Sequence, residues 1–169
     1  MAKSPASRSN KKAPSQAAVA WHEAKEAIQE TINDANGLIV TFGGYTKVIG
    51  NEVFMGGLTP ERRAKLTESL NVIRISAGNL LAVVKPITAS LEKEISRKRE
   101  ERSLERLRVL DSELIEAILA YNEAAITSGH IDNVQSIVTD TVDSLNVATE
   151  STEATPVVAT VEPTTNPTE

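Results

Sequence analysis

The histidines and carboxylates are the residues whose chemistry would first suggest a catalytic or metal site. His22 opens the segment His-Glu-Ala-Lys-Glu, which shares its first two residues with the H-E-x-x-H zinc motif but lacks the second histidine. His130 is far away in the sequence, and the absence of cysteine excludes thiolate catalysis and disulfides. Asp111, Glu113 and Glu116 are close together but follow the ordinary spacing of an exposed helix face. We therefore expect no metal, no cofactor, no small-molecule substrate and no enzymatic activity.

Basic residues are the stronger candidates for a functional contact, and they occur in two groups. The first group lies in an arm at residues 1–14 that contains no acidic residue. The second lies in a charge run at residues 92–108, where interleaved acidic residues dilute the positive field. Cations at this density can neutralise the phosphates of a nucleic acid. The candidate residues for that contact are Lys3, Arg8, Lys11, Lys12, Arg97, Lys98, Arg99 and Arg102. The arm would also serve as a solubilising tail or a targeting peptide, and the charge run would also suit ion pairing within an assembly or simple solvation.

Charge is distributed unevenly along the chain. All 18 Lys and Arg residues lie at or before Arg108, whereas residues 109–169 carry acidic residues only, and the net charge is -5. Such asymmetry suggests an electrostatic partner, either a nucleic acid for the basic half or a second copy of the chain. Aromatic residues make up only 3% of the sequence, so the core must be built from aliphatic side chains. This composition favours thin seams between helices.

Apolar residues recur every three to four positions over four stretches, which predicts helices at about 15–36, 60–85, 87–128 and 131–146. Ser15 and Thr59 are suitable N-caps, and Pro60 suits the first helical position. Trp21, the only tryptophan, lies on an apolar stripe, and we interpret it as a packing residue rather than a platform for a nucleobase. At Pro86 the helix either kinks or ends, because proline lacks a backbone donor.

The stretch at 87–128 contains neither glycine nor proline, and its charge run is too polar for a buried seam. We expect one helix of about 60 Å, which would be a stalk or would need a coiled-coil partner. The apolar half of this helix and the next helix, at 107–146, are predicted to pair as an antiparallel hairpin.

The segment at 37–58 differs from the rest because it holds six of the eight glycines and both phenylalanines. Gly43-Gly44 lies between two runs rich in β-branched and aromatic residues, so we predict a small β-hairpin or a glycine-hinged loop inserted between helices. The glycine spacing does not match a phosphate-binding loop. Three roles remain open for this segment: a contact surface for another chain, an apolar loop at a membrane surface, or a structural cap on the helices.

Both ends of the chain are predicted to be disordered, with a basic arm at 1–14, a helical domain at 15–146 and an acidic tail at 147–169. The arm has no apolar h-region, so we expect no signal peptide. The sequence contains no run of about 18 apolar residues, so we expect no membrane span. The predicted location is cytoplasmic or otherwise intracellular, with a virion as an alternative.

The sequence as a whole predicts a mainly α, elongated helical bundle with a glycine-rich insert and disordered termini. This outline is broadly similar to small viral structural or assembly proteins, including those of phages, and no residue role follows from that similarity. We expect a non-enzymatic assembly protein that binds itself or another structural protein, and the alternative is a nucleic-acid-binding accessory protein. The predicted protein-contact residues are Phe42, Tyr45, Phe54, Met55, Leu66, Leu70, Ile73, Leu114 and Tyr121.

Overall fold

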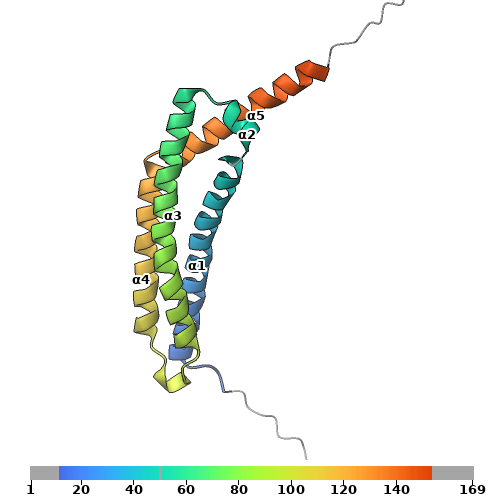
Figure 1. Ribbon diagram of the computed structural model, residues 1–169. Coiled ribbons are helices and arrows are strands. Elements are labelled where there is room, and N and C mark those ends of the chain that lie inside the picture. Colours follow the sequence, from blue (N-terminus) through green and yellow to red (C-terminus); the bar gives the residue numbers. More distant parts are fainter. Residues whose placement is uncertain (1–11, 50, 154–169) are drawn as a thin grey trace, which may run out of the picture.

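Three long helices lie side by side and form the body of the molecule (Figure 1). The computed structural model describes residues 12–49 and 51–153, and within these ranges the chain is helical without a β-strand. The long helices are α1 (Gln16–Ile49), α3 (Pro60–Ile95) and α4 (Leu104–Tyr121). Helices α1 and α4 run in one direction and α3 runs in the opposite one. The prediction of a mainly α protein is confirmed.

Shorter elements join the long helices at the two ends of the bundle (Figure 1). At one end α2 (Glu52–Gly56) connects α1 to α3, and at the other end the 3-10 turn η1 (Arg99–Glu101) connects α3 to α4. The π-helical turn η2 (Asn122–Thr127) continues α4. Helix α5 (His130–Glu153) then crosses α3 and extends beyond the bundle.

Helix α3 is the centre of the packing, because it contacts α1, α4 and α5. Its buried apolar residues recur every three to four positions, as the sequence predicts, and they are Leu66, Leu70, Ile73, Ala77, Leu80, Val84, Ile87 and Leu91. The neighbouring helices contribute Trp21, Ile28, Ile32 and Ala35 from α1, and Leu107, Leu114 and Tyr121 from α4. These side chains form one core along the bundle.

Two of the predicted helix starts are confirmed at atomic detail. Thr59 Oγ1 accepts a hydrogen bond of 3.3 Å from the backbone N–H of Arg62, and Pro60 occupies the first helical position. Ser15 Oγ accepts from the backbone N–H of Ala18 at 3.3 Å. Each cap satisfies a donor that the first turn of a helix leaves without an intrahelical partner.

The predicted β-hairpin is wrong. Residues 37–49 continue α1, and the next residues that the structure describes form α2. Leu38, Phe42 and Tyr45 are spaced by four and three residues, so they extend the buried stripe of α1 and pack against the core. Gly43 and Gly44 lie within this helix and not at a turn. The helical period of the aliphatic and aromatic residues therefore prevails over the local turn signal.

Pro86 neither ends α3 nor begins a new helix, because α3 continues without interruption to Ile95. A proline inside a helix frees the carbonyl four residues earlier, which here belongs to Ala82. Ala82 and Pro86 are both exposed, so water can satisfy that carbonyl. Thr88 Oγ1 also donates to the carbonyl of Val84 at 2.9 Å on the adjoining turn.

The prediction of one helix over residues 87–128 is wrong. The chain reverses at residues 96–103, which we call the corner, and α4 returns along α3. The charge run at 92–108 therefore forms one end of the bundle rather than a solvated shaft. No stalk of about 60 Å exists, because both halves of the predicted helix pack against other helices.

The predicted pairing of the last two helices is also wrong, because α5 packs on α3 and α2 and meets α4 only around η2. Gly129, with φ of 81°, lets the chain leave η2 in a new direction. His130 Nδ1 lies 3.1 Å from the buried Ser69 Oγ of α3, and Arg62 Nη2 lies 3.5 Å from Asp140 Oδ2. Helix α5 runs on to Glu153, so residues 147–153 of the predicted tail are helical. The rest of that tail and residues 1–11 of the arm lie outside the described residues.

Among the helices in the described ranges, α3 alone is long and apolar enough to cross a membrane by length and composition. This property is weak support for a membrane span, because the central helix of a bundle shares it. In this chain α3 has that central place.

Candidate interaction surfaces

Glu94 holds the corner together. Its side chain is 3% exposed and accepts a hydrogen bond of 2.6 Å from the backbone N–H of Ser103. Arg106 donates to both carboxylate oxygens, from Nε at 2.9 Å and from Nη2 at 3.3 Å. Arg97 Nε lies 3.1 Å from Glu94 Oε2 and forms an ion pair without hydrogen-bond geometry. One carboxylate thus joins the end of α3 to the start of α4.

The surroundings of Glu94 keep its side chain ionised. Burial alone would raise the pKa of Glu94. The hydrogen bonds from Arg106 and Ser103, together with the positive charges of Arg106 and Arg97, outweigh burial and hold that pKa below its ordinary value. The carboxylate is therefore a charged anchor of the corner at neutral pH.

Arg102 completes the corner from the other side. Its Nε donates to the carbonyl of Arg97 at 3.2 Å, and its Nη2 donates to the carbonyl of Ile95 at 3.1 Å. These bonds satisfy acceptors at the end of α3. The guanidinium carbon also lies 4.5 Å from the centre of the Trp21 ring, which is a cation–π distance. Trp21 is 6% exposed, so its prediction as a packing residue is confirmed.

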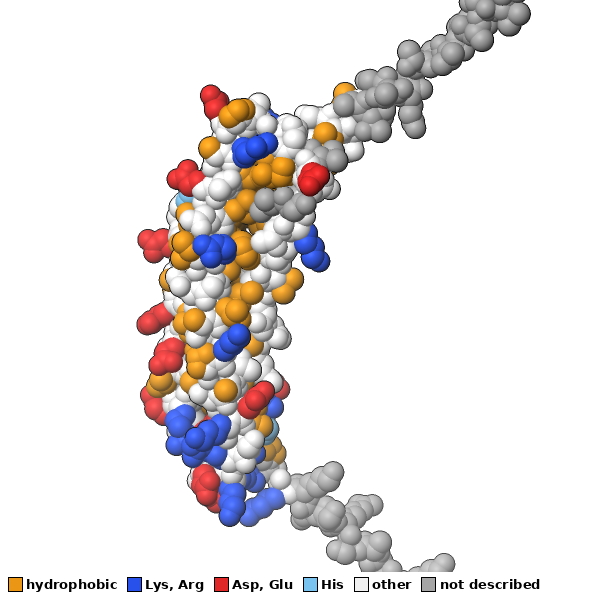
Figure 2. Space-filling model, viewed as in Figure 1, with side chains coloured by type: hydrophobic (Ala, Val, Ile, Leu, Met, Phe, Trp, Pro, Cys, Tyr) orange, Lys and Arg blue, Asp and Glu red, His pale blue; other side chains and the backbone are white. Residues whose placement is uncertain are grey.

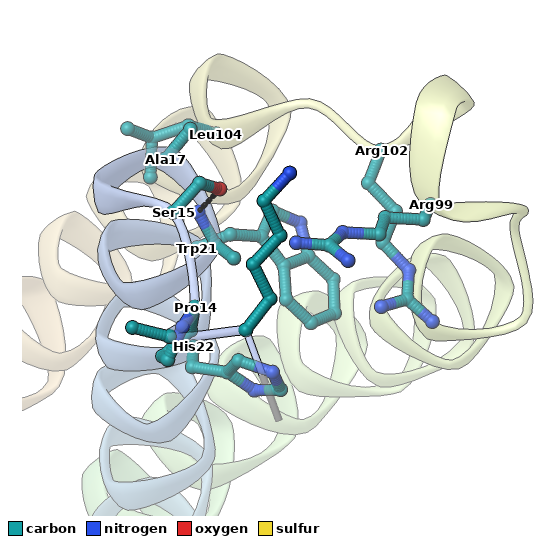
Figure 3. Close-up of a pocket in the computed structure, with 11 residues that line it drawn as sticks. Pro14, Ser15, Ala17, Trp21, His22, Arg99, Arg102 and Leu104 are labelled. Carbon is teal, nitrogen blue, oxygen red and sulfur yellow. Dashed lines mark hydrogen bonds between the residues drawn. The ribbon is translucent and has the colours of Figure 1, made fainter. Parts of the chain in front are cut away.

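A surface cavity of about 890 Å³ lies between the corner and the start of α1 (Figure 3). Arg99 and Arg102 extend from the corner toward Trp21 and His22 of α1. The lining residues are Lys12, Ala13, Pro14, Ser15, Ala17, Ala18, Trp21, His22, Arg99, Arg102 and Leu104. Lys12 thus lines the same cavity as two arginines from the second basic group, although almost ninety residues separate them in the sequence. Figure 2 shows that Lys and Arg side chains gather at this end of the molecule.

The other predicted nucleic-acid residues are placed as follows. Lys98 and Arg99 are exposed, whereas Arg97 is half-buried and paired with Glu94. Arg97 therefore has a structural role in addition to its predicted one. Lys3, Arg8 and Lys11 lie outside the described residues.

Most of the predicted protein-contact residues belong to the core of the chain itself. Six of them are buried, namely Phe54, Leu66, Leu70, Ile73, Leu114 and Tyr121. They are not accessible to a second chain in this fold, so their prediction as intermolecular contacts is corrected. Phe42, Tyr45 and Met55 are half-buried against the core, and for these three the contact stays a prediction. Burial, and next the neighbouring Tyr45, raise the pKa of Tyr121.

The outward side of α4 and η2 carries an apolar stripe that the sequence analysis did not single out. Ile115, Leu119 and Ile126 are 43%, 60% and 42% exposed. A spacing of four residues places Ile115 and Leu119 on one side of α4, away from the buried Leu114, and Ile126 is exposed in the π-helical turn η2 that follows. Large exposed aliphatic residues in a row often mark a contact surface. The signal was present in the sequence, but it could not be separated from the core stripe of the same helix.

Within residues 12–49 and 51–153, no cluster of three or more His, Asp or Glu side chains could hold a metal ion. No family model, curated protein or solved structure matches the chain. The two surfaces that remain for a functional interpretation are the stripe on α4 and the cavity at the corner.

Proposed function

We propose that this chain is a non-enzymatic helical assembly protein that forms a homodimer through α4. The observation that carries the proposal is the stripe of Ile115, Leu119 and Ile126, which the fold leaves uncovered. Helix α4 already buries its opposite face against α1 and α3, so its exposed face is the part left to pack against a second copy. A symmetric pair of chains uses the same patch on both partners.

The charges along α4 favour an antiparallel pair. Arg108 lies near the start of the helix, and no basic residue follows it, whereas Glu123 lies in η2 at the far end. An antiparallel arrangement centred between Ile115 and Glu116 brings Arg108 of each chain opposite Glu123 of the second copy. The same arrangement places Arg108 of each chain beside the η2 turn of its partner. A parallel pair would instead bring like charges together, which is unfavourable.

The size of the stripe limits the affinity. One helix face buries less surface than the roughly 1,600 Å² of a standard specific interface. We therefore expect a dimer with a dissociation constant of about 10–100 μM rather than a permanent assembly. Phe42, Tyr45 and Met55 are available for a second contact in a larger assembly.

The test is sedimentation equilibrium of Leu119→Glu beside Val40→Glu. Leu119→Glu places a charge at the centre of the stripe, so it should weaken dimerisation at least tenfold. Val40 is 72% exposed on α1 and off the stripe, which makes Val40→Glu a matched control that should dimerise like the original chain. A monomer for the original chain at several hundred micromolar, or equal weakening by both variants, would contradict the proposal.

A charge exchange tests the antiparallel arrangement. Arg108→Glu and Glu123→Arg should each weaken the dimer severalfold, and the double variant should restore it. The measurement is the dimer dissociation constant at low salt. Additive weakening in the double variant would refute this arrangement while leaving dimerisation itself intact.

A further inference from the structure

The corner cavity is lined by three positively charged side chains, those of Lys12, Arg99 and Arg102. In the part of the chain that the structure describes, no carboxylate oxygen lies within 4.0 Å of a side-chain nitrogen of Lys12, Arg99 or Arg102. Glu100 and Glu101 share the turn η1 with Arg99 but do not line the cavity. A ligand in the cavity therefore faces three positively charged side chains.

The start of α1 adds to the positive field. The first turn of this helix has no acidic residue, although acidic side chains are favoured there. Ser15, which caps the helix, lines the cavity together with Ala17 and Ala18. The positive end of a helix of 34 residues is thus at the cavity wall.

An independent observation is a hydrogen-bond donor without an acceptor. The Nε1 atom of Trp21 is buried and has no hydrogen-bond partner among the residues that the structure describes, and Trp21 is one of the residues that line the cavity (Figure 3). Buried polar groups in folded proteins nearly always have a partner. Trp21 therefore has a donor without an acceptor in the wall of a cavity that three cations also line, which favours an anionic ligand.

We propose that the corner cavity binds the phosphate backbone of a single-stranded nucleic acid. Arg99 and Lys12 contact phosphates, and the Trp21 N–H donates to a phosphate or sugar oxygen. The three cations come from two separate segments of the chain, the start of α1 and the corner, so they can contact more than one phosphate of a strand. A strand with regularly repeated phosphates suits this series of cations better than a protein with one acidic patch does.

The arrangement of Trp21 and Arg102 makes the binding independent of base sequence. A nucleobase usually stacks on an exposed aromatic ring, but Arg102 lies over the ring of Trp21 and Trp21 is almost wholly buried. Contacts to the backbone position a strand without reading its sequence. This inference is separate from dimerisation, because the cavity and the stripe on α4 use different residues.

The experiment is fluorescence anisotropy with a labelled oligothymidylate of about 20 nucleotides, long enough to span the cavity. The full chain should bind at low salt, and its affinity should fall steeply as salt increases. The double variant Lys12→Ala/Arg99→Ala should bind about tenfold more weakly, with a salt slope smaller by about 1.4. Within the described ranges these two side chains form no hydrogen bond or ion pair, so the fold should persist.

The matched control is Lys85→Ala/Arg74→Ala, which removes the same two charges from exposed positions on α3. It should bind within about twofold of the original chain, because bound phosphates do not reach these positions. Absence of binding by the full chain at low salt would overturn the proposal, and so would an equal loss in both double variants. If polyglutamate competed equally strongly, the ligand of the cavity would be an acidic protein rather than a nucleic acid, which would likewise overturn the proposal.

Trp21→Phe tests the indole donor separately. Phenylalanine keeps the core apolar and removes only the N–H and part of the ring, so we expect severalfold weaker binding with an unchanged salt slope. Thermal unfolding without oligonucleotide checks that the variant folds. Binding equal to that of the original chain would overturn the role of Trp21.

Discussion

Glu94 is the residue on which the shape of the α3–α4 end depends. It is the buried member of a group in which Arg97 and Arg106 are half-exposed, so water weakens each ion pair but does not reach the carboxylate freely. The hydrogen bond from the Ser103 N–H adds a neutral donor. Glu94 is therefore the charged anchor of the corner, and the backbone contacts of Arg102 complete it.

We expect Glu94→Gln to lower the free energy of unfolding by about 2 kcal/mol at neutral pH, because the amide loses charge-assisted bonds. A carboxyl whose pKa is lowered in the folded chain stabilises the fold above its unfolded pKa of about 4.3, and this stabilisation is lost as the pH falls through the folded value. The variant should thus show a flatter loss of stability on acidification. Urea unfolding across the acidic range measures both effects.

Glu92→Gln is the control for that experiment, since Glu92 is an exposed carboxylate on the same turn of α3. Its stability should change by less than about 0.5 kcal/mol. A comparable loss for both variants would mean that Glu94 has no special role in the corner.

Single residues were predicted from the sequence only where their role is local. Ser15, Thr59 and Pro60 act within their own helix turn, and the sequence predicts all three correctly. The roles of Glu94 and Arg102 depend on the chain reversing, so they could not be deduced before the corner was known. For the same reason, the sequence did not predict that Lys12 and Arg99 line one cavity.

Among the helices, α1 is the element that departs most from its prediction. Its glycines resemble a turn in the sequence, yet an added Cβ at Gly43 or Gly44 would meet no atom within 4 Å. The glycines therefore do not serve close packing. They weaken the last turns of a helix that the core stripe still holds in place.

We predict that Gly44→Ala raises the free energy of unfolding by about 0.5–1 kcal/mol, because alanine loses less backbone freedom in a helix. Gly129→Ala should lower it by about 1 kcal/mol, since the left-handed conformation of Gly129 is strained for alanine. Thermal unfolding of the two variants compares them directly. Destabilisation by Gly44→Ala would favour a turn at this position over the helix.

The type of element was easier to predict than its ends. The periodic stripes of α3 and α4 indicate helices correctly, because both helices bury one face along their whole length. The end of a helix depends on which carbonyls and donors find partners outside it, and this information lies in the tertiary contacts. Pro86 is an example, because α3 continues past this proline and the carbonyl that the proline frees faces solvent.

At the scale of the whole molecule, Lys and Arg side chains gather at the corner end, which carries the basic cavity (Figure 2). Helix α5 contains acidic residues and no basic one, and Arg62 near the start of α3 pairs with Asp140 of α5. The proposed dimer, with antiparallel α4 helices, would place a basic cavity at each end of the assembly. Two cavities on one dimer would let it hold two segments of one strand, and the combined affinity would exceed that of either cavity.

The corner has a consequence for the order in which the chain folds. Its hydrogen bonds join residues that are 9 and 12 positions apart, whereas the bond from Thr31 to Asp111 joins α1 to α4 across 80 positions. Closing a short loop loses less entropy, so we expect α3 and α4 to pair in the transition state and α1 to dock later. Leu107→Ala should then mainly slow refolding, and Ile28→Ala should mainly speed unfolding, in stopped-flow measurements with urea. Slower refolding of Ile28→Ala and faster unfolding of Leu107→Ala would mean that α1 is already packed in the transition state. In a growing chain, α1 is made first, so it would then have to stay unpaired until α3 and α4 have been synthesised.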